Sequence, residues 1–141
     1  MRMKIAILLL VCLIYAGCTT SRAVIADSVN LSNYNYATII NVMSYGGSPD
    51  LMDLEVRVFN SLSATRLRVI GDREIPYLTN SQRQELLLVR FSASQMASSS
   101  SIAINFVEYA TGRPVASFTG TSEVGMNSAI NSAVNRMQRM F

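Results

Sequence analysis

The sequence has 141 residues, carries a formal net charge of +3 and contains no histidine. The absence of histidine excludes Ser-His-Asp and Cys-His catalysis, haem ligation by histidine and zinc sites that depend on histidine. A charge this small gives no indication of nucleic-acid binding. Hydrophobic residues make up 50% of the chain, which is enough for one domain to bury a core.

The chain begins with the pattern of an export signal. Met1-Arg2-Met3-Lys4 is positively charged, residues 5–14 are apolar, and Tyr15-Ala16-Gly17-Cys18 follows. An apolar run of about 7–15 residues is typical of a signal peptide, whereas a membrane-spanning helix needs about 20. We therefore expect residues 1–17 to be a signal peptide.

Ala16-Gly17-Cys18 resembles the processing site of bacterial lipoproteins. The resemblance implies that Cys18 receives diacylglycerol, that the chain is cleaved before it, and that its new amino group takes a fatty acid such as palmitate. Two or more acyl chains hold a protein stably on a membrane. Tyr15 departs from the family pattern, in which leucine is usual. The alternative is an ordinary secretory signal in which Cys18 has no special role.

The residues around the cleavage site also indicate the location of the mature protein. Thr19, rather than an aspartate, follows the cysteine, which in such lipoproteins implies the outer membrane. We expect a periplasm-facing, lipid-anchored protein of the bacterial cell envelope. Cys12 lies within the signal, so Cys18 is the only cysteine of the mature chain and no intrachain disulfide can form.

We expect residues 18–33 to form the lipidated N-terminus and a flexible stem, and residues 34–141 to form a single α+β domain. Residues 23–26 could alternatively form an edge strand. Asp27-Ser28-Val29 resembles the short O-glycosylation signal of Bacteroides-type bacteria, with Ser28 as the acceptor. A plain exposed stem is the alternative.

The first half of the domain predicts a β-α-β arrangement. Residues 36–44 are apolar and β-branched, as in a buried strand. After the glycines at 46 and 47, Ser48 and Pro49 suit the start of a helix. Residues 66–70 alternate as in a strand. The apolar stripe of the helix has helical spacing and consists of Leu51, Leu54, Val58 and Leu62.

The second half predicts further strands and a closing helix. Residues 72–84 suit a short helix or an ordered loop, residues 85–94 a strand, and 102–109 with 114–121 a hairpin. The apolar stripe of the last helix consists of Met126, Ala129, Ile130, Ala133, Val134, Met137 and Met140. Together the elements predict an α+β two-layer sandwich, β-α-β-β-β-α, with a mixed sheet and helices on one face.

Two stretches, Asn30-Leu31-Ser32-Asn33-Tyr34 and residues 104–120, make the chain similar to small uncharacterised envelope lipoproteins of Bacteroides-type bacteria. The resemblance implies a hairpin followed by an amphipathic C-terminal helix. It supplies no active-site residue.

Few residues are candidates for catalysis or ligand binding. Asp72 and Glu108 are candidates for a carboxylate pair of the kind that hydrolyses glycans, although ordinary surface ion pairs explain Asp72-Arg73-Glu74 equally simply. Thr111-Gly112-Arg113 fits a turn, and the glycines at 46 and 47 match no phosphate-binding pattern. No metal or cofactor site is predicted.

We therefore expect a non-enzymatic binding or assembly module. Its partners would be the membrane, through the lipid on Cys18, and an envelope protein, but no nucleic acid. The alternatives are a histidine-free, carboxylate-based hydrolase directed at glycans and a carrier of a small apolar ligand.

Overall fold

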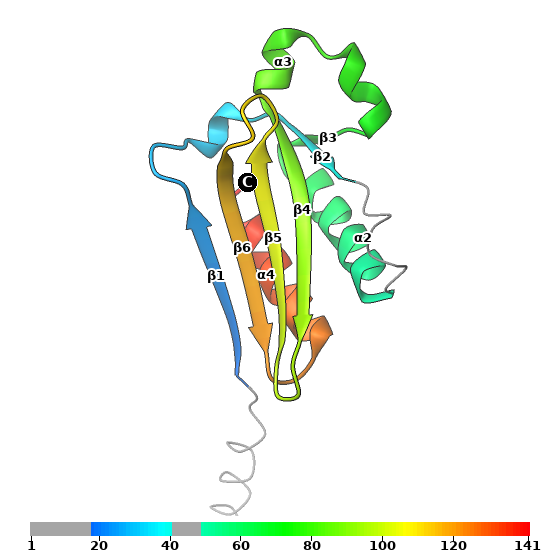
Figure 1. The fold of residues 1–141 in the computed structure, drawn as a ribbon, viewed down its shortest axis with the longest axis vertical. Helices are drawn as coiled ribbons and strands as arrows, with labels where there is room; N and C mark the ends of the chain where they lie inside the picture. The colour runs from blue at the N-terminus through cyan, green and yellow to red at the C-terminus, as the bar shows by residue number, and fades with distance from the viewer. Residues whose placement is uncertain (1–17, 41–48) are drawn as a thin grey trace, which may run out of the picture.

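A mixed six-stranded sheet organises the residues that the computed structural model describes, 18–40 and 49–141 (Figure 1). The strand order is β1-β6-β5-β4-β2-β3. Strands β1, β6, β5 and β4 are antiparallel neighbours, whereas β2 runs parallel to both β4 and β3. The bounds are β1 (Thr19–Ile25), β2 (Tyr36–Ile39), β3 (Arg68–Val69), β4 (Leu86–Gln95), β5 (Ser100–Glu108) and β6 (Pro114–Ser122).

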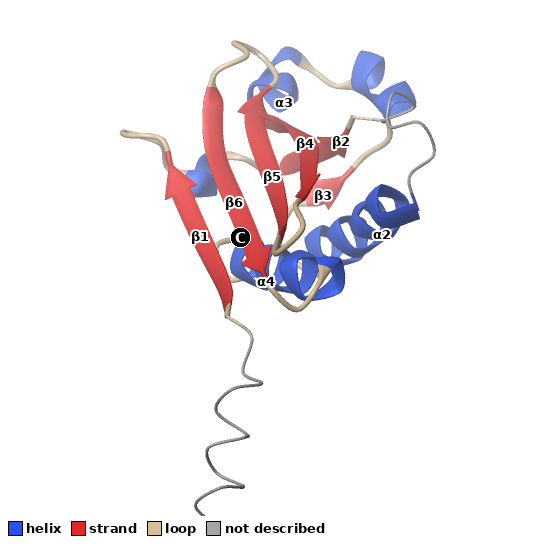
Figure 2. Cartoon of the chain, turned by 60° about the horizontal axis from the view of Figure 1, so that its bottom comes forward, coloured by secondary structure: helices blue, strands red, loops and turns tan. Residues whose placement is uncertain are grey.

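Two helices cover one face of this sheet, as Figure 2 shows. Helix α2 (Pro49–Ser63) packs on β2 and β3, and helix α4 (Met126–Gln138) packs on β1, β5 and β6. The connections hold the shorter helices η1 (Leu31–Asn33), η3 (Asp72–Tyr77) and α3 (Asn80–Gln84). The predicted fold class, an α+β two-layer sandwich with a mixed sheet and helices on one face, is confirmed.

The core lies between the helices and the sheet. Strand alternation places every second side chain on this face. Both predicted helix stripes point into it, except that Met140 lies beyond the end of α4 and is 39% exposed. Phe106 and Phe118 meet edge to face with ring centroids 5.6 Å apart, and Phe141 packs on both rings. The largest fully buried side chains of this core include Leu54, Leu62, Leu87, Ile102, Ile104, Phe106, Phe118, Ile130 and Met137.

Gly120 sets how closely α4 approaches β6. A Cβ atom at this position would lie 2.0 Å from the carbonyl oxygen of Ala129 and 2.7 Å from the amide nitrogen of Ala133. Both atoms belong to the helix backbone and cannot rotate away. Only glycine therefore allows the helix and the strand to pack at this distance.

The segment from η3 to α3 covers part of the opposite face, which we call the open face. The Thr38 hydroxyl donates to Asp72 Oδ1 at 3.2 Å, and Gln82 Nε2 donates to the Tyr36 hydroxyl at 3.1 Å. Beneath the segment Leu86 and Thr38 are buried. The sequence prediction of a short helix or ordered loop for residues 72–84 is thus confirmed, with both a 3-10 helix and an α-helix present.

Strand β1 corrects the expected flexible stem. Residues 19–25 pair with β6 over seven residues, and η1 follows before residue 34. Ala23 and Ile25 pack at the margin of the core, which explains why this polar stretch is ordered as a strand. The domain therefore begins before residue 34. β1 is a sixth strand beside the five segments predicted as strands, of which the predicted order β-α-β-β-β-α shows four.

The remaining predictions differ in length or fall outside the described residues. Strand β2 is described to Ile39, and the strand predicted for residues 66–70 is reduced to Arg68–Val69. The signal peptide, the glycines at 46 and 47 and the Ser48 cap lie outside the described residues. None of the helices in the described part of the chain is long and apolar enough to cross a membrane.

Candidate functional site

The two carboxylates proposed from the sequence lie on different faces of the sheet. Asp72 accepts from Thr38 on the open face. Glu108 pairs in register with Leu87, whose side chain is in the core, so Glu108 lies on the helix-covered face. The structure does not bring Asp72 and Glu108 together, because each belongs to its own side of the sheet.

Glu108 instead holds the β5–β6 turn to the segment before β2. The hydroxyl of Tyr34 donates to Glu108 Oε1 at 3.3 Å, and the hydroxyl of Thr111 donates to Oε2. Burial, followed by the charge of Glu108 and the hydrogen bond to it, raises the pKa of Tyr34 above its ordinary value of 10.0. The turn itself contains Gly112 at φ 71°, as the predicted turn requires. Both oxygens of Glu108 thus have structural partners.

A shallow hollow of about 430 Å³ beside Glu108 also includes Glu85. Glu85 Oε2 accepts a hydrogen bond from Asn35 Nδ2 at 2.7 Å. Glu108 thus shares a concave surface with Glu85, and a second hollow of about 310 Å³ is lined by Glu108 and Asp27, whereas neither hollow includes Asp72.

The Asp72-Arg73-Glu74 segment forms the start of η3. Glu74 Oε1 accepts from the Gly71 amide at 3.2 Å, and Glu74 also lies 3.9 Å from the exposed guanidinium of Arg68. These are the capping and surface contacts of an exposed helix start. Among the described residues, no group of three or more Cys, Asp or Glu side chains is placed to hold a metal ion.

The most distinctive surface is the outer edge of β1, which has no neighbouring strand among the described residues (Figure 1). The Ala26 amide donates to the Val115 carbonyl, and the Glu123 amide donates to the Cys18 carbonyl. The β1–β6 register between these bonds is regular. Because antiparallel bonding alternates, the even-numbered residues of β1 bond to β6. The amides and carbonyls on the free edge belong to Thr19, Ser21, Ala23 and Ile25.

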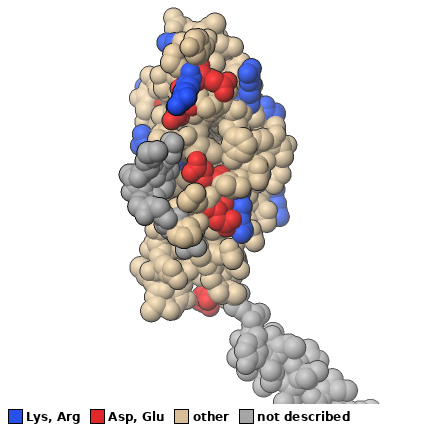
Figure 3. Space-filling model, turned by 90° about the vertical axis from the view of Figure 1, so that its right-hand side faces the viewer, with Lys and Arg blue, Asp and Glu red and all other residues tan. Residues whose placement is uncertain are grey.

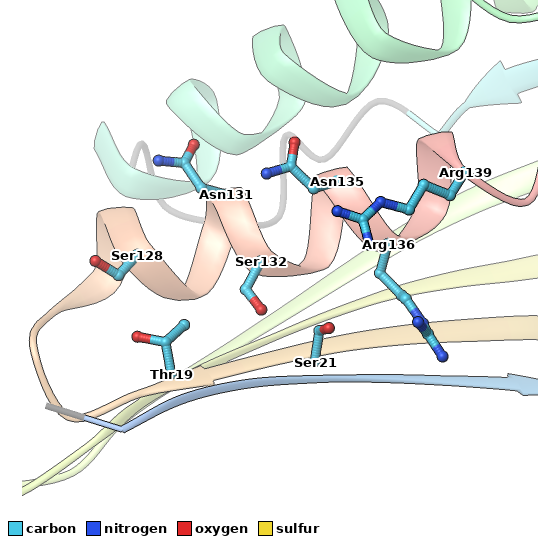
Figure 4. A pocket seen from close by; sticks show the side chains of 8 residues that line it. All are labelled: Thr19, Ser21, Ser128, Asn131, Ser132, Asn135, Arg136 and Arg139. Carbon is cyan, nitrogen blue, oxygen red and sulfur yellow. The ribbon is translucent and has the colours of Figure 1, made fainter. Parts of the chain in front are cut away.

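A polar groove of about 380 Å³ runs beside this free edge, between β1 and α4 (Figure 4). Ser132 Oγ donates to the Thr20 carbonyl at 3.0 Å and ties the helix to the strand. The lining contains hydroxyls, amides and two guanidinium groups but no acidic side chain. It consists of Thr19, Ser21, Ser128, Asn131, Ser132, Asn135, Arg136 and Arg139. The groove therefore favours polar or negatively charged groups.

The two modification sites proposed from the sequence lie at opposite ends of β1. Cys18 is exposed and directly precedes the strand. Ser28 is exposed in the turn after the strand and has a φ of 64°. Lipidation of Cys18 and glycosylation of Ser28 stay predictions.

Sequence reasoning missed two surfaces. One is the edge formed by the first half of β1. Its residues are polar, so the sequence lacks the alternation of polar and apolar residues that would predict a strand. The other is a second apolar arc on α2, made by Met52, Val56 and Phe59, which are exposed. Their spacing of four and three residues is helical and could have revealed it.

Comparisons with known proteins identify the fold alone. No family model and no curated protein matches the sequence. The PelC dodecamer from Paraburkholderia phytofirmans has 17% identity and a TM-score of 0.52, covering 88% of this chain and 98% of that chain. A PelC variant dodecamer from the same organism has 15% identity and a TM-score of 0.50, covering 87% and 97%.

A PDZ domain protein from Parabacteroides distasonis ATCC 8503 is also similar in structure. It has 8% identity and a TM-score of 0.60, and the match covers 87% of this chain but only 36% of that chain. At these identities the matches show that the fold occurs in other proteins of known structure, and they assign no activity to this chain.

Proposed function

We propose that this chain is a lipid-anchored protein of the bacterial envelope that acts as a non-enzymatic binding or assembly module. The observation that carries the proposal is the free edge of β1 beside a groove lined by hydrogen-bond donors. An extended segment of a partner protein adds to this edge as a further strand. Main-chain hydrogen bonds provide affinity in this mode of recognition, and alternate side chains provide specificity.

The groove defines the chemistry of the partner segment. Side chains of an added strand that point toward α4 meet the hydroxyl of Ser21 and the guanidinium of Arg136. No acidic group lines the groove, so acidic or amide side chains at alternate positions fit it best. The β1 edge is seven residues long, has no proline or lysine, and carries one charged residue, Arg22, so it has little protection against pairing.

Two further facts support the proposal. The exposed Cys18 immediately precedes β1, so a lipid on Cys18 would hold the free edge close to the membrane surface. PelC, whose fold is similar, is a dodecamer, which supports assembly as a use of this fold. Neither fact depends on a catalytic group.

A proline substitution tests the free edge without breaking the sheet. The Ser21 amide faces outward, so Ser21→Pro removes an outward donor and leaves the bonds from β1 to β6 in place. We expect Ser21→Pro to abolish crosslinking of the partner in cells, while Ser21→Ala retains it. Retained crosslinking in a folded Ser21→Pro variant would contradict the proposal.

The anchor is tested separately with Cys18→Ala. We expect this variant to leave the membrane fraction and to take up less labelled fatty acid than the wild type. An unchanged distribution with unchanged fatty-acid uptake would contradict lipid anchoring but not strand addition.

The alternative function, a carboxylate-based hydrolase, would use a different surface and can be tested separately. The hollow shared by Glu85 and Glu108 is where it would act. Glycan cleavage by the purified chain that disappears in Glu108→Gln would favour the hydrolase over the binding module.

A further inference from the structure

Helix α2 has a second apolar arc that the core does not use. Met52, Val56 and Phe59 are 64%, 57% and 49% exposed. They surround a shallow depression of about 290 Å³ that also includes Glu55. An exposed cluster of large apolar side chains on one helix face is typical of an interaction surface. We call these three residues the α2 patch.

The α2 patch faces away from the other described helix on this side of the sheet, α4. Successive residues of an α-helix are separated by about 100° around its axis, which puts the patch on the flank opposite Arg57. The Arg57 guanidinium donates to Asn131 and Asn127 of α4 at 2.7 and 3.2 Å. The patch therefore lies on the flank away from α4, at the β3 end of the sheet. Figure 3 views this side and shows acidic side chains in its middle.

A mainly apolar groove of about 400 Å³ lies on the other side of the molecule, on the open face. It extends from β1 across β6 and β5 to Arg90 on β4. Val24, at 47% exposure, is one of its exposed apolar side chains. Other residues of its lining are Ala26, Val107, Pro114 and Val115. We call this the sheet groove.

The two surfaces are complementary in charge. Glu55 lies beside the α2 patch, and Arg90 lies at the margin of the sheet groove. Within residues 18–40 and 49–141, neither side chain has an ion-pair partner, since the described ion pairs are Arg57–Asp53 and Arg68–Glu74. An apolar contact flanked by opposite charges fixes the direction in which two molecules join.

From these observations we infer that the α2 patch of one copy binds the sheet groove of a second copy. The two surfaces lie at opposite ends of the strand order and on opposite faces of the sheet, so one molecule cannot satisfy both by itself. A head-to-tail contact of this kind repeats from copy to copy and forms a ring when its rotation closes. The inference goes beyond the proposed function, because it uses neither the free edge of β1 nor the polar groove.

Mixing two variants of the full-length, membrane-extracted chain tests the inference. Val56→Asp blocks the patch and Val24→Asp blocks the sheet groove, and both positions are exposed, so the fold is retained. We expect the wild type to sediment as an oligomer and each variant alone as a monomer. An equimolar mixture should form dimers and nothing larger, because each variant keeps one intact surface.

The controls are Ser61→Asp, one turn after Arg57 on the other flank of α2, and Thr20→Asp on the open face of β1. Both should assemble as the wild type does, as should Ser21→Pro, whose defect concerns only the proposed strand addition. A monomeric wild type would overturn the inference, and so would a Val24→Asp variant that still assembles. If Val56→Asp fails to assemble but Val24→Asp still assembles, the contact is a symmetric one between two α2 helices, and this result would also overturn the inference.

Discussion

The two faces of the sheet differ although the same strands form both. On the helix-covered face, β5 contributes Ile102, Ile104 and Phe106, all fully buried. On the open face the intervening side chains include Ala103 and Asn105, and among the described residues the segment from η3 to α3 covers part of this face. Helices α2 and α4 cover one face, whereas much of the other face and the free edge of β1 stay exposed in the described structure. Substitutions that are equivalent in chemistry should therefore have unequal effects on the two faces.

The largest effect is expected for Gly120→Ala on the helix-covered face. The new Cβ would meet backbone atoms of α4 at 2.0 and 2.7 Å, so the helix must move as a whole. We expect a loss in the free energy of unfolding greater than the roughly 3 kcal/mol of ordinary overpacking. Gly71→Ala is the control, because its nearest neighbour would be a side-chain atom at 3.9 Å. Chemical denaturation measures both, and equal losses would contradict the close packing of α4.

Adjacent leucines on β4 compare the two faces directly. Leu87 is fully buried in the main core, whereas Leu88 is only half-buried on the open face. Leu87→Ala should lower the free energy of unfolding by about 3 kcal/mol. Leu88→Ala should cost about 1 kcal/mol, since less apolar area is lost. A reversal of this order in urea denaturation would mean that the faces are assigned wrongly.

Two arginines near β3 give a smaller contrast. The guanidinium of Arg66 donates to the carbonyls of Leu31 and Tyr34 and so ties the segment before β3 to the segment before β2. Arg68 is exposed and makes one ion pair at 3.9 Å. We expect Arg66→Ala to cost about 1.5 kcal/mol and Arg68→Ala to cost roughly 0–0.5 kcal/mol. Thermal unfolding of the two variants would distinguish them.

The smallest effect concerns pH and Tyr34. Its raised pKa means that the folded chain holds the phenol proton more tightly than the unfolded chain does. This contribution to stability is complete below about pH 10 and is lost as the pH rises through the folded pKa. The wild type should therefore lose stability more steeply above pH 10.0 than Tyr34→Phe. Parallel curves for the two proteins would show that the phenol does not contribute.

The covered face could be predicted from the sequence because its signals are periodic. The stripe of α4 and the hairpin of β5 and β6 alternate clearly, and both occur as predicted. Strand β1 could not be predicted in full, since its side chains are polar and only the pairing with β6 specifies it. The carboxylate pair failed for a related reason: the register of β4 and β5 places Glu108 on the helix-covered face, whereas Asp72, at the start of η3, bonds to Thr38 on the open face.

The most direct test of the free edge is hydrogen exchange at single amides of β1. The amides of Arg22 and Val24 bond to β6, whereas those of Ser21 and Ala23 face outward. In the purified chain we predict slow exchange at Arg22 and Val24 and fast exchange at Ser21 and Ala23. Slow exchange at all four amides would show that the edge is already covered, and fast exchange at all four would show that β1 does not pair with β6. Either result would contradict the account of an available edge.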